Sequence, residues 1–289
     1  IVVLIFGVET AGGIGAVIHN ASELPGYLSM TLSYDINTGK AAPYSALTIV
    51  STAAWGLGYF GMPHILLRFM AIEDEKKLKL SRRVATIWVV ISLFVAVFIG
   101  VIGYTMSKVG ALEMLTGSNS ETIIVKISAL LSQHGVIFAL LAGVILAGIL
   151  ASTMSTSDSQ LLAASSAVSS DILGAFRKDS SNKNGSMAAA RITLLVISVV
   201  AAFIARNPDS SVFAIVSFAW AGFGAAFGPV VLFSLFWKRT SKWGALAGMV
   251  CGGSMVFIWK YLIRPLGGIW NIYELLPAFL IACAAIVIV

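Results

Sequence analysis

The sequence has very little charge. Of its 289 residues, 11% are Asp, Glu, Lys or Arg, whereas 58% are hydrophobic. A soluble domain carries about 25% charged residues, so this chain cannot cover a water-facing surface with charged groups. The composition therefore excludes an ordinary soluble domain and indicates that lipid is the solvent.

Cysteine and histidine are also scarce. Cys251 and Cys283 both lie in apolar segments, and no metal-ligand spacing accompanies them. The three histidines, His19, His64 and His134, form neither a metal-binding pattern nor a triad with a nucleophile. No glycine-rich phosphate loop followed by Lys and Ser or Thr is present. The sequence thus gives no sign of a disulfide framework, of nucleotide hydrolysis or of an enzyme.

What the chain does contain is a series of long apolar segments. A membrane-spanning helix needs about 20 mostly apolar residues, and this length recurs along the sequence. The pattern predicts an all-α polytopic membrane protein. Both ends fall inside apolar runs, so we expect a fragment of a longer protein, with the end of a truncated helix at 1–8 and an extramembrane loop at 9–43. The predicted spans are residues 44–70, 84–106, 136–168, 188–205, 212–237, 244–263 and 272–289.

The formal net charge of +6 raises the question of a nucleic-acid partner. The basic residues, however, lie in short clusters between apolar segments, which is typical of membrane loops. By the positive-inside rule, the clusters at 76–83, 177–191 and 238–242 face the cytoplasm. We therefore expect a multi-pass protein of the cytoplasmic membrane with no nucleic-acid partner. The outer loop at 120–132 has the spacing of a short amphipathic helix.

The first motif with chemical content interrupts the first full span. Three glycines and Pro63 fall within residues 55–63. Glycine and proline weaken a helix, and an interrupted helix at mid-membrane depth is the best sequence pointer to a transport site. Freed N–H groups suit a carboxylate, and Trp55 and Tyr59, four residues apart, can wall an apolar ring. Trp55, Gly58, Tyr59 and Pro63 all lie within this interruption, which makes it a candidate substrate site. The alternative is that the glycines only permit close helix packing.

The second motif is a cluster of hydroxyl groups in the long span at 136–168. Ser155 and Thr156 offer adjacent hydroxyls, and the Ser152 carbonyl lies one helical turn earlier. Oxygen ligands suit a hard cation such as sodium, although Ser and Thr in membrane helices also bond their own backbone. Asp158 is an intramembrane carboxylate, which is a functional hypothesis by default. Asp158 has either an ion-pathway role or a solvated or paired structural role.

A third motif has small residues at 221, 224, 225 and 228, followed by Pro229. It predicts a tightly packing helix face with a kink at the proline. A packing bend is favoured over a gate hinge.

These motifs resemble the solute:sodium symporter family. The likeness is carried by residues 55–63 with His64-Ile65 and Arg68-Phe69-Met70, by residues 154–156 and 159–162, and by residues 217–232, 244–249 and 273–277. It covers about residues 54–289. The resemblance implies the LeuT-like inverted-repeat fold, here incomplete: residues 44–237 as the second five-helix repeat and residues 238–289 as two peripheral helices.

The resemblance also implies a function. It suggests sodium-coupled uptake by alternating access, with proline as the expected solute and sodium as a transported ion rather than a prosthetic group. The resemblance places substrate contacts on Trp55, Tyr59 and Pro63, and Gly58 lies among these candidate substrate-binding residues. It places sodium on the Ser152 carbonyl and the hydroxyls of Ser155 and Thr156. The sequence departs from the family pattern at Ser157 and Asp158. Two alternatives stay open: symport of another small solute, and a transporter-like sensor module.

Overall fold

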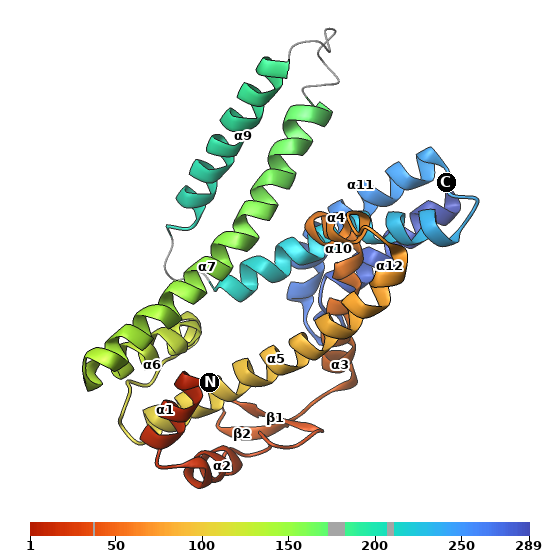
Figure 1. The fold of residues 1–289 in the computed structure, drawn as a ribbon. Helices are drawn as coiled ribbons and strands as arrows, with labels where there is room; N and C mark the ends of the chain where they lie inside the picture. Colours follow the sequence, from red (N-terminus) through yellow and green to blue (C-terminus); the bar gives the residue numbers. More distant parts are fainter. Residues whose placement is uncertain (37, 173–182, 207–210) are drawn as a thin grey trace. The chain divides into compact units, whose positions relative to one another are not determined.

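The computed structural model describes residues 1–36, 38–172, 183–206 and 211–289, and the chain is mostly helical (Figure 1). It divides into two compact units, which are described separately. Unit 1 comprises Ile1–Phe6 and Leu112–Ser210, and unit 2 comprises Gly7–Ala111 and Ser211–Val289.

The prediction of an all-α membrane protein is confirmed at the level of its helices. Five helices within the described ranges are long and apolar enough to cross a membrane, and a sixth span is possible if one bent helix pair is counted. Residues 44–70 do not form one continuous span, because a break divides them into short pieces. Residues 272–289 yield only a 14-residue apolar helix. The five long helices are Glu75–Lys108, Val136–Ser169, Met187–Ile204, Val212–Phe236 and Lys242–Leu266.

Unit 1 is built around a pair of long helices. Helix α7 (Val136–Ser166) continues into a π-helical turn at Ala167–Ile172 and runs beside α9 (Lys183–Ile204) (Figure 1). The buried Ser165 hydroxyl donates a hydrogen bond to the Ala190 carbonyl at 2.7 Å and so joins the two helices. The first part of the predicted cytoplasmic loop between them, 177–182, lies outside the described residues.

The short amphipathic helix predicted at 120–132 is confirmed. Helix α6 (Ile123–Leu131) follows a 3₁₀ turn at Gly117–Thr122 and precedes another at Ser132–His134. Ile127 and Leu131, four residues apart, are fully buried. The apolar stripe is therefore the buried face of the helix, as the spacing indicates.

Residues 9–43, which we expect to form an extramembrane loop, contain regular secondary structure. Helix α1 (Val2–Thr10) is followed by α2 (Ile14–Ser22), bent from it by 74°, and then by a hairpin of β1 (Leu32–Asp35) and β2 (Lys40–Pro43). Gly12 and Gly13 both have positive φ, which ends one helix and redirects the chain into the next. The Gly-rich and polar flanks concealed the short apolar helix between them.

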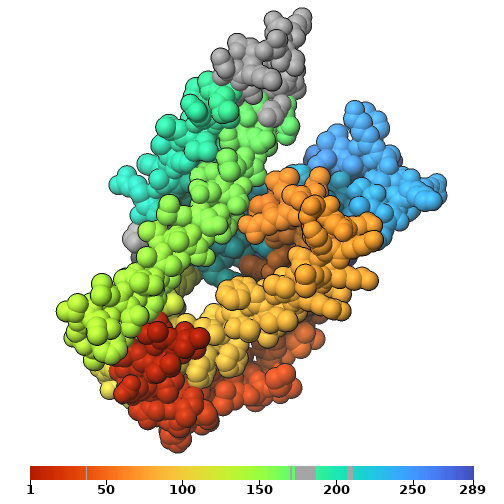
Figure 2. Space-filling model, viewed as in Figure 1, coloured from red at the N-terminus to blue at the C-terminus, as the bar shows by residue number. Residues whose placement is uncertain are grey.

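Helix α5 (Leu78–Lys108) is the long helix of unit 2 that precedes residue 111. Its large apolar side chains lie mostly on its surface, among them Trp88 and Phe94, and the helix is drawn in yellow in Figure 2. Such a surface suits hydrocarbon rather than water. Lys108 at its end pairs with Glu23, just after α2.

The core of unit 2 lies where three C-terminal helices pack together: α10 (Val212–Phe236), α11 (Lys242–Ile258) and α12 (Leu275–Ile288) (Figure 1). Helices α11 and α12 are joined through a π turn at Trp259–Ile263 and 3₁₀ turns at Arg264–Leu266 and Gly268–Trp270. Helix α10 continues through Pro229 without ending there. The predicted small-residue face is confirmed, since its four members are buried: Ala221, Gly224, Ala225 and Gly228.

Candidate functional site

The interruption predicted within residues 55–63 is present. Helix α3 (Ala46–Ala53) gives way to a 3₁₀ helix, η1 (Ala54–Gly61), and α4 (Pro63–Met70) begins after the extended residue Met62. The Ser45 hydroxyl caps α3 by accepting a hydrogen bond from the Thr48 N–H at 3.2 Å. Pro63 stands in the first turn of α4, where its missing N–H leaves no helix bond unmade.

Glycines allow η1 to lie directly against α10. A Cβ atom on Gly58 would be 2.0 Å from the Nε1 atom of Trp220, and one on Gly61 would be 2.2 Å from the Phe223 carbonyl oxygen. From the other side, a Cβ on Gly224 would be 2.7 Å from the Gly58 Cα. Real Cβ atoms do not approach so closely, so these positions require glycine. Close packing is therefore one role of the glycines, alongside any role in binding.

The Trp55 ring is at the centre of an aromatic stack. Its centroid lies 5.6 Å from Phe213, 5.6 Å from Trp220 and 5.8 Å from Tyr273, with interplanar angles of 9°, 15° and 15°. Tyr59 meets the Trp220 ring edge-on at 4.7 Å and 84°. These are favourable aromatic geometries. The Tyr59 side chain is still 51% exposed, so the break carries a packed aromatic wall with one ring available for contact.

Hydrogen bonds fix this wall to the backbone. The Trp220 Nε1 donates to the Trp55 carbonyl at 3.0 Å. The Tyr273 hydroxyl donates to the Ser217 carbonyl at 2.6 Å, and the Tyr273 backbone N–H donates to the Ser51 hydroxyl at 3.0 Å. The stack thus joins α3, η1, α10 and the segment before α12.

The sequence predicts only part of this wall. Trp55 and Tyr59 are among the predicted site residues, whereas Trp220, Phe213 and Tyr273 are not. Phe213 and Tyr273 lie at the ends of apolar segments far from the break in sequence. The one available signal is an aromatic residue at such an end, and this signal is common in membrane proteins.

A buried charge lies next to Tyr273. The Glu274 side chain is 1% exposed; one oxygen is 2.8 Å from Arg264 Nη1 and the other is 4.0 Å from Lys260 Nζ. Arg264 also donates from Nε to the Asn271 Oδ1 at 3.1 Å. Lys260 Nζ lies 3.9 Å from the centroid of the Phe218 ring. The carboxylate is therefore paired, as burial requires.

The hydroxyl cluster lies on α7, in unit 1. Ser152, Ser155, Thr156 and Asp158 are all exposed. The Thr156 hydroxyl donates to the Ser152 carbonyl at 3.3 Å, and the Ser159 hydroxyl donates to the Ser155 carbonyl at 3.1 Å. Thr156 therefore bonds its own helix, as the alternative interpretation holds. The same bond keeps two oxygen atoms, the Ser152 carbonyl and the Thr156 hydroxyl, next to each other. Across the described parts of the chain, no group of three His, Cys, Asp or Glu side chains is arranged for a metal.

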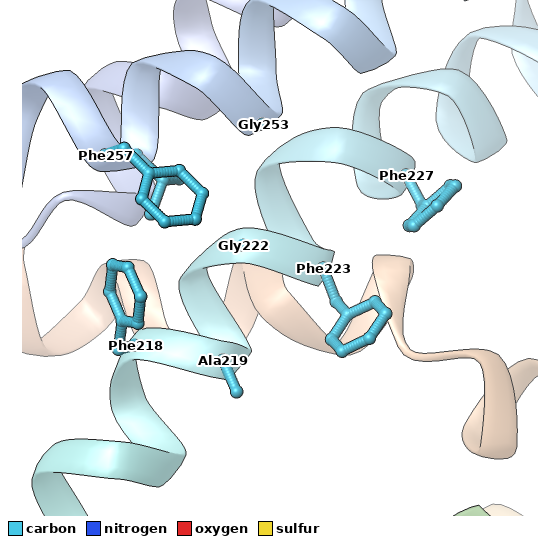
Figure 3. Close-up of a pocket in the computed structure, with 8 residues that line it drawn as sticks. Phe218, Ala219, Gly222, Phe223, Phe227, Gly253 and Phe257 are labelled. Atoms are coloured by element: carbon cyan, nitrogen blue, oxygen red, sulfur yellow. The ribbon is translucent and has the colours of Figure 1, made fainter. Parts of the chain in front are cut away.

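An apolar pocket of about 270 Å³ lies between α10 and α11 (Figure 3). Phe218 and Phe257 face each other edge-on in it, 5.2 Å apart, and Phe223 and Phe227 line it further along α10. None of the four candidate substrate-binding residues lines this pocket. The aromatic wall and the pocket are separate features of unit 2.

A set of apolar helices of membrane length with an interrupted, aromatic-walled helix among them defines a membrane transport protein. The family comparison specifies the class further, because the model of the sodium:solute symporter family matches residues 1–252. The chain belongs to that family, as its motifs indicate. The family comprises symporters, which agrees with the prediction that the chain is not an enzyme.

The similar proteins are proline transporters by name. The chain is 40% identical over 243 residues to the sodium/proline symporter of Salmonella typhimurium, covering 84% of this chain and 46% of that protein. It is 39% identical over 245 residues to the osmoregulated proline transporter OpuE of Bacillus subtilis, covering 85% and 48%. It is 40% identical over 237 residues to the high-affinity proline transporter PutP of the same species, covering 81% and 47%. The chain spans about half the length of these relatives. No solved structure matches it.

Proposed function

We propose that the chain forms part of a symporter that takes up proline together with sodium across the cytoplasmic membrane by alternating access. The observation that carries this proposal is the aromatic wall around Trp55 at the interrupted helix. The proline transporters among the relatives support proline as the solute. The resemblance supports the LeuT-like inverted-repeat arrangement, with residues 44–237 as its second repeat and 238–289 as peripheral helices.

The chemistry of proline matches the residues at the break. The methylene groups of its pyrrolidine ring are apolar and can lie against an aromatic side chain, and the exposed Tyr59 ring beside Trp220 offers such a face. Its carboxylate is favoured near a helix N-terminus, which α4 provides at Pro63. Trp55 and Gly58 contribute by fixing the shape of the wall. In this proposal the solute lies along η1, between Trp55 and Pro63.

For sodium we propose the oxygen atoms of α7. The Ser152 carbonyl and the hydroxyls of Ser155 and Thr156 are hard ligands on one helix segment, and Asp158 follows them in the ion pathway. Sodium binding would favour the conformation that binds the solute. The two sites would then share a coupling free energy, so each ligand would raise the affinity for the other.

The test is uptake of labelled proline by the full-length protein in cells that lack other proline carriers. Excess unlabelled proline should abolish the signal, whereas other amino acids and small carboxylates at the same concentration should leave most of it. If another solute competes as well as proline does, symport of that solute replaces the proposal. Tyr59→Ala should reduce proline uptake, with Tyr261→Ala, an exposed tyrosine of the α11–α12 connection, as the matched control.

A further inference from the structure

We propose that Tyr273, in the connection between α11 and α12, is a positioning residue for the solute site and sets its affinity by holding Trp55 in place. The inference rests on the proposed function, because it assigns Tyr273 to the same aromatic wall. It adds a contribution from beyond residue 252, where the match to the family model ends.

Tyr273 contacts three segments that must keep their relative positions for the wall to exist. Its ring stacks on Trp55 of η1 at 5.8 Å. Its hydroxyl donates to the Ser217 carbonyl of α10, and its backbone N–H donates to the Ser51 hydroxyl of α3. Since α3 ends one residue before the break begins, these bonds fix the segments on both sides of the Trp55 ring.

Tyr273 is itself held in place by the polar contacts of its neighbours. The adjacent Glu274 is buried and pairs with Arg264, which also donates to Asn271. These contacts tie the two ends of the α11–α12 connection together across residues 264–274. Lys260, at 4.0 Å, brings a second cation to the same carboxylate. Because these contacts hold Tyr273 in place, its ring can restrain the Trp55 ring.

The Trp55 ring also stacks on Phe213, an exposed residue near the start of α10. If the hydrogen bond of the Tyr273 hydroxyl is lost, the Trp55 ring gains conformational freedom. The interruption of the helix and the close glycine contacts remain. The expected consequence is weaker solute binding in a protein that still folds, because the ring must then be ordered each time the solute binds.

The experiment measures the KM and maximal rate of proline uptake by the full-length protein, normalised to the amount of protein in the membrane. Tyr273→Phe keeps the ring and removes the donor to Ser217, and Ser51→Ala removes the acceptor of the Tyr273 N–H. Loss of one such bond corresponds to a factor of about 3 to 10 in affinity. We expect KM to rise by that factor in each variant, with the normalised maximal rate nearly unchanged. Tyr261→Phe makes the same chemical change on the same connection and should keep the wild-type KM.

A purely structural role for Tyr273 would lower the amount of protein in the membrane and leave KM unchanged, and this result overturns the inference. If Tyr273→Phe does not reach the membrane, Ser51→Ala decides by the same KM criterion. The proposed function is tested separately by the wild type. If the wild type takes up another solute instead of proline, the variants are compared with that solute, and an unchanged KM again overturns the role of Tyr273.

Discussion

The indole Nε1 of Trp220 donates a hydrogen bond to the backbone carbonyl of Trp55 at 3.0 Å, although the two residues are 165 positions apart in the sequence. The two rings also stack, 5.6 Å apart. The bond reaches into the 3₁₀ segment η1, where the chain departs from the regular α-helix. Trp220 thus holds both the backbone and the ring of Trp55, and the site depends on α10 as much as on the interrupted helix.

Replacing Trp220 by phenylalanine removes this donor and keeps an aromatic ring. Loss of the bond and of part of the stack should weaken proline binding by about 1–2 kcal/mol. The measurement is the KM for proline uptake by the full-length protein. Trp243→Phe is the control, because Trp243 is an exposed residue of α11 whose ring centroid lies 5.8 Å from the Lys242 ammonium. Equal KM values in the two variants would contradict the role given to Trp220.

Gly58→Ala tests the close approach of η1 to α10. The new methyl group would lie 2.0 Å from Trp220 Nε1, so one of the two segments must move. Overpacking of this kind costs about 1–3 kcal/mol, and we expect lower thermal stability in detergent and lower uptake. Gly56→Ala is a matched control two residues away in the same 3₁₀ helix, since its methyl group would meet nothing within 4 Å. Similar melting temperatures for the two variants would show that the approach is not tight.

The sodium ligands are tested on α7. Replacing Ser155 and Thr156 together by alanine removes two proposed oxygen ligands, so the sodium concentration for half-maximal uptake should rise by about tenfold or more, which corresponds to roughly 1.4 kcal/mol or more. Thr153→Ala is the control, because the Thr153 hydroxyl donates to the Ile149 carbonyl of the same helix and has no assigned ligand role. An unchanged sodium dependence in the double variant would remove both residues as ligands.

Arg264→Met tests the charge cluster beside Tyr273. Glu274 would then keep only Lys260, at 4.0 Å, as a cationic partner in a buried position. Removing one partner of a buried ion pair costs about 3–5 kcal/mol; we expect a loss below that range, because the Arg264 side chain is 41% exposed and Lys260 remains. Thermal unfolding in detergent measures the effect. Lys77→Met breaks the exposed Lys77–Glu73 pair and should change stability by less than about 0.5 kcal/mol. A loss of stability in Lys77→Met as large as that in Arg264→Met would mean that the burial of Glu274 does not cause the effect.

The features that the sequence predicted are those set by local chemistry. Three glycines and Pro63 within nine residues weaken a helix locally, so the sequence predicts the interruption. The spacing of apolar residues likewise predicts the amphipathic helix α6. The apolar helix α2 was missed because nine residues between polar flanks give only a weak local signal.

The features that the sequence did not predict depend on contacts between distant segments. Tyr273 belongs to the wall only because the connection before α12 returns to α3 and α10. Glu274 is buried and is paired there with Arg264, ten residues earlier in the chain. Neither relationship leaves a periodic pattern in the chain. The small residues of α10 indicate a packing face. The sequence does not indicate that η1 is the segment that packs against it.

The most direct test of the central claim is the initial rate of labelled proline uptake by the full-length protein in proteoliposomes, measured with an inward sodium gradient and with the same sodium concentration on both sides. Sodium-coupled symport predicts rapid accumulation above equilibrium with the gradient and only equilibration without it. Equal accumulation in the two conditions, or accumulation driven equally well by potassium, would contradict sodium-coupled symport.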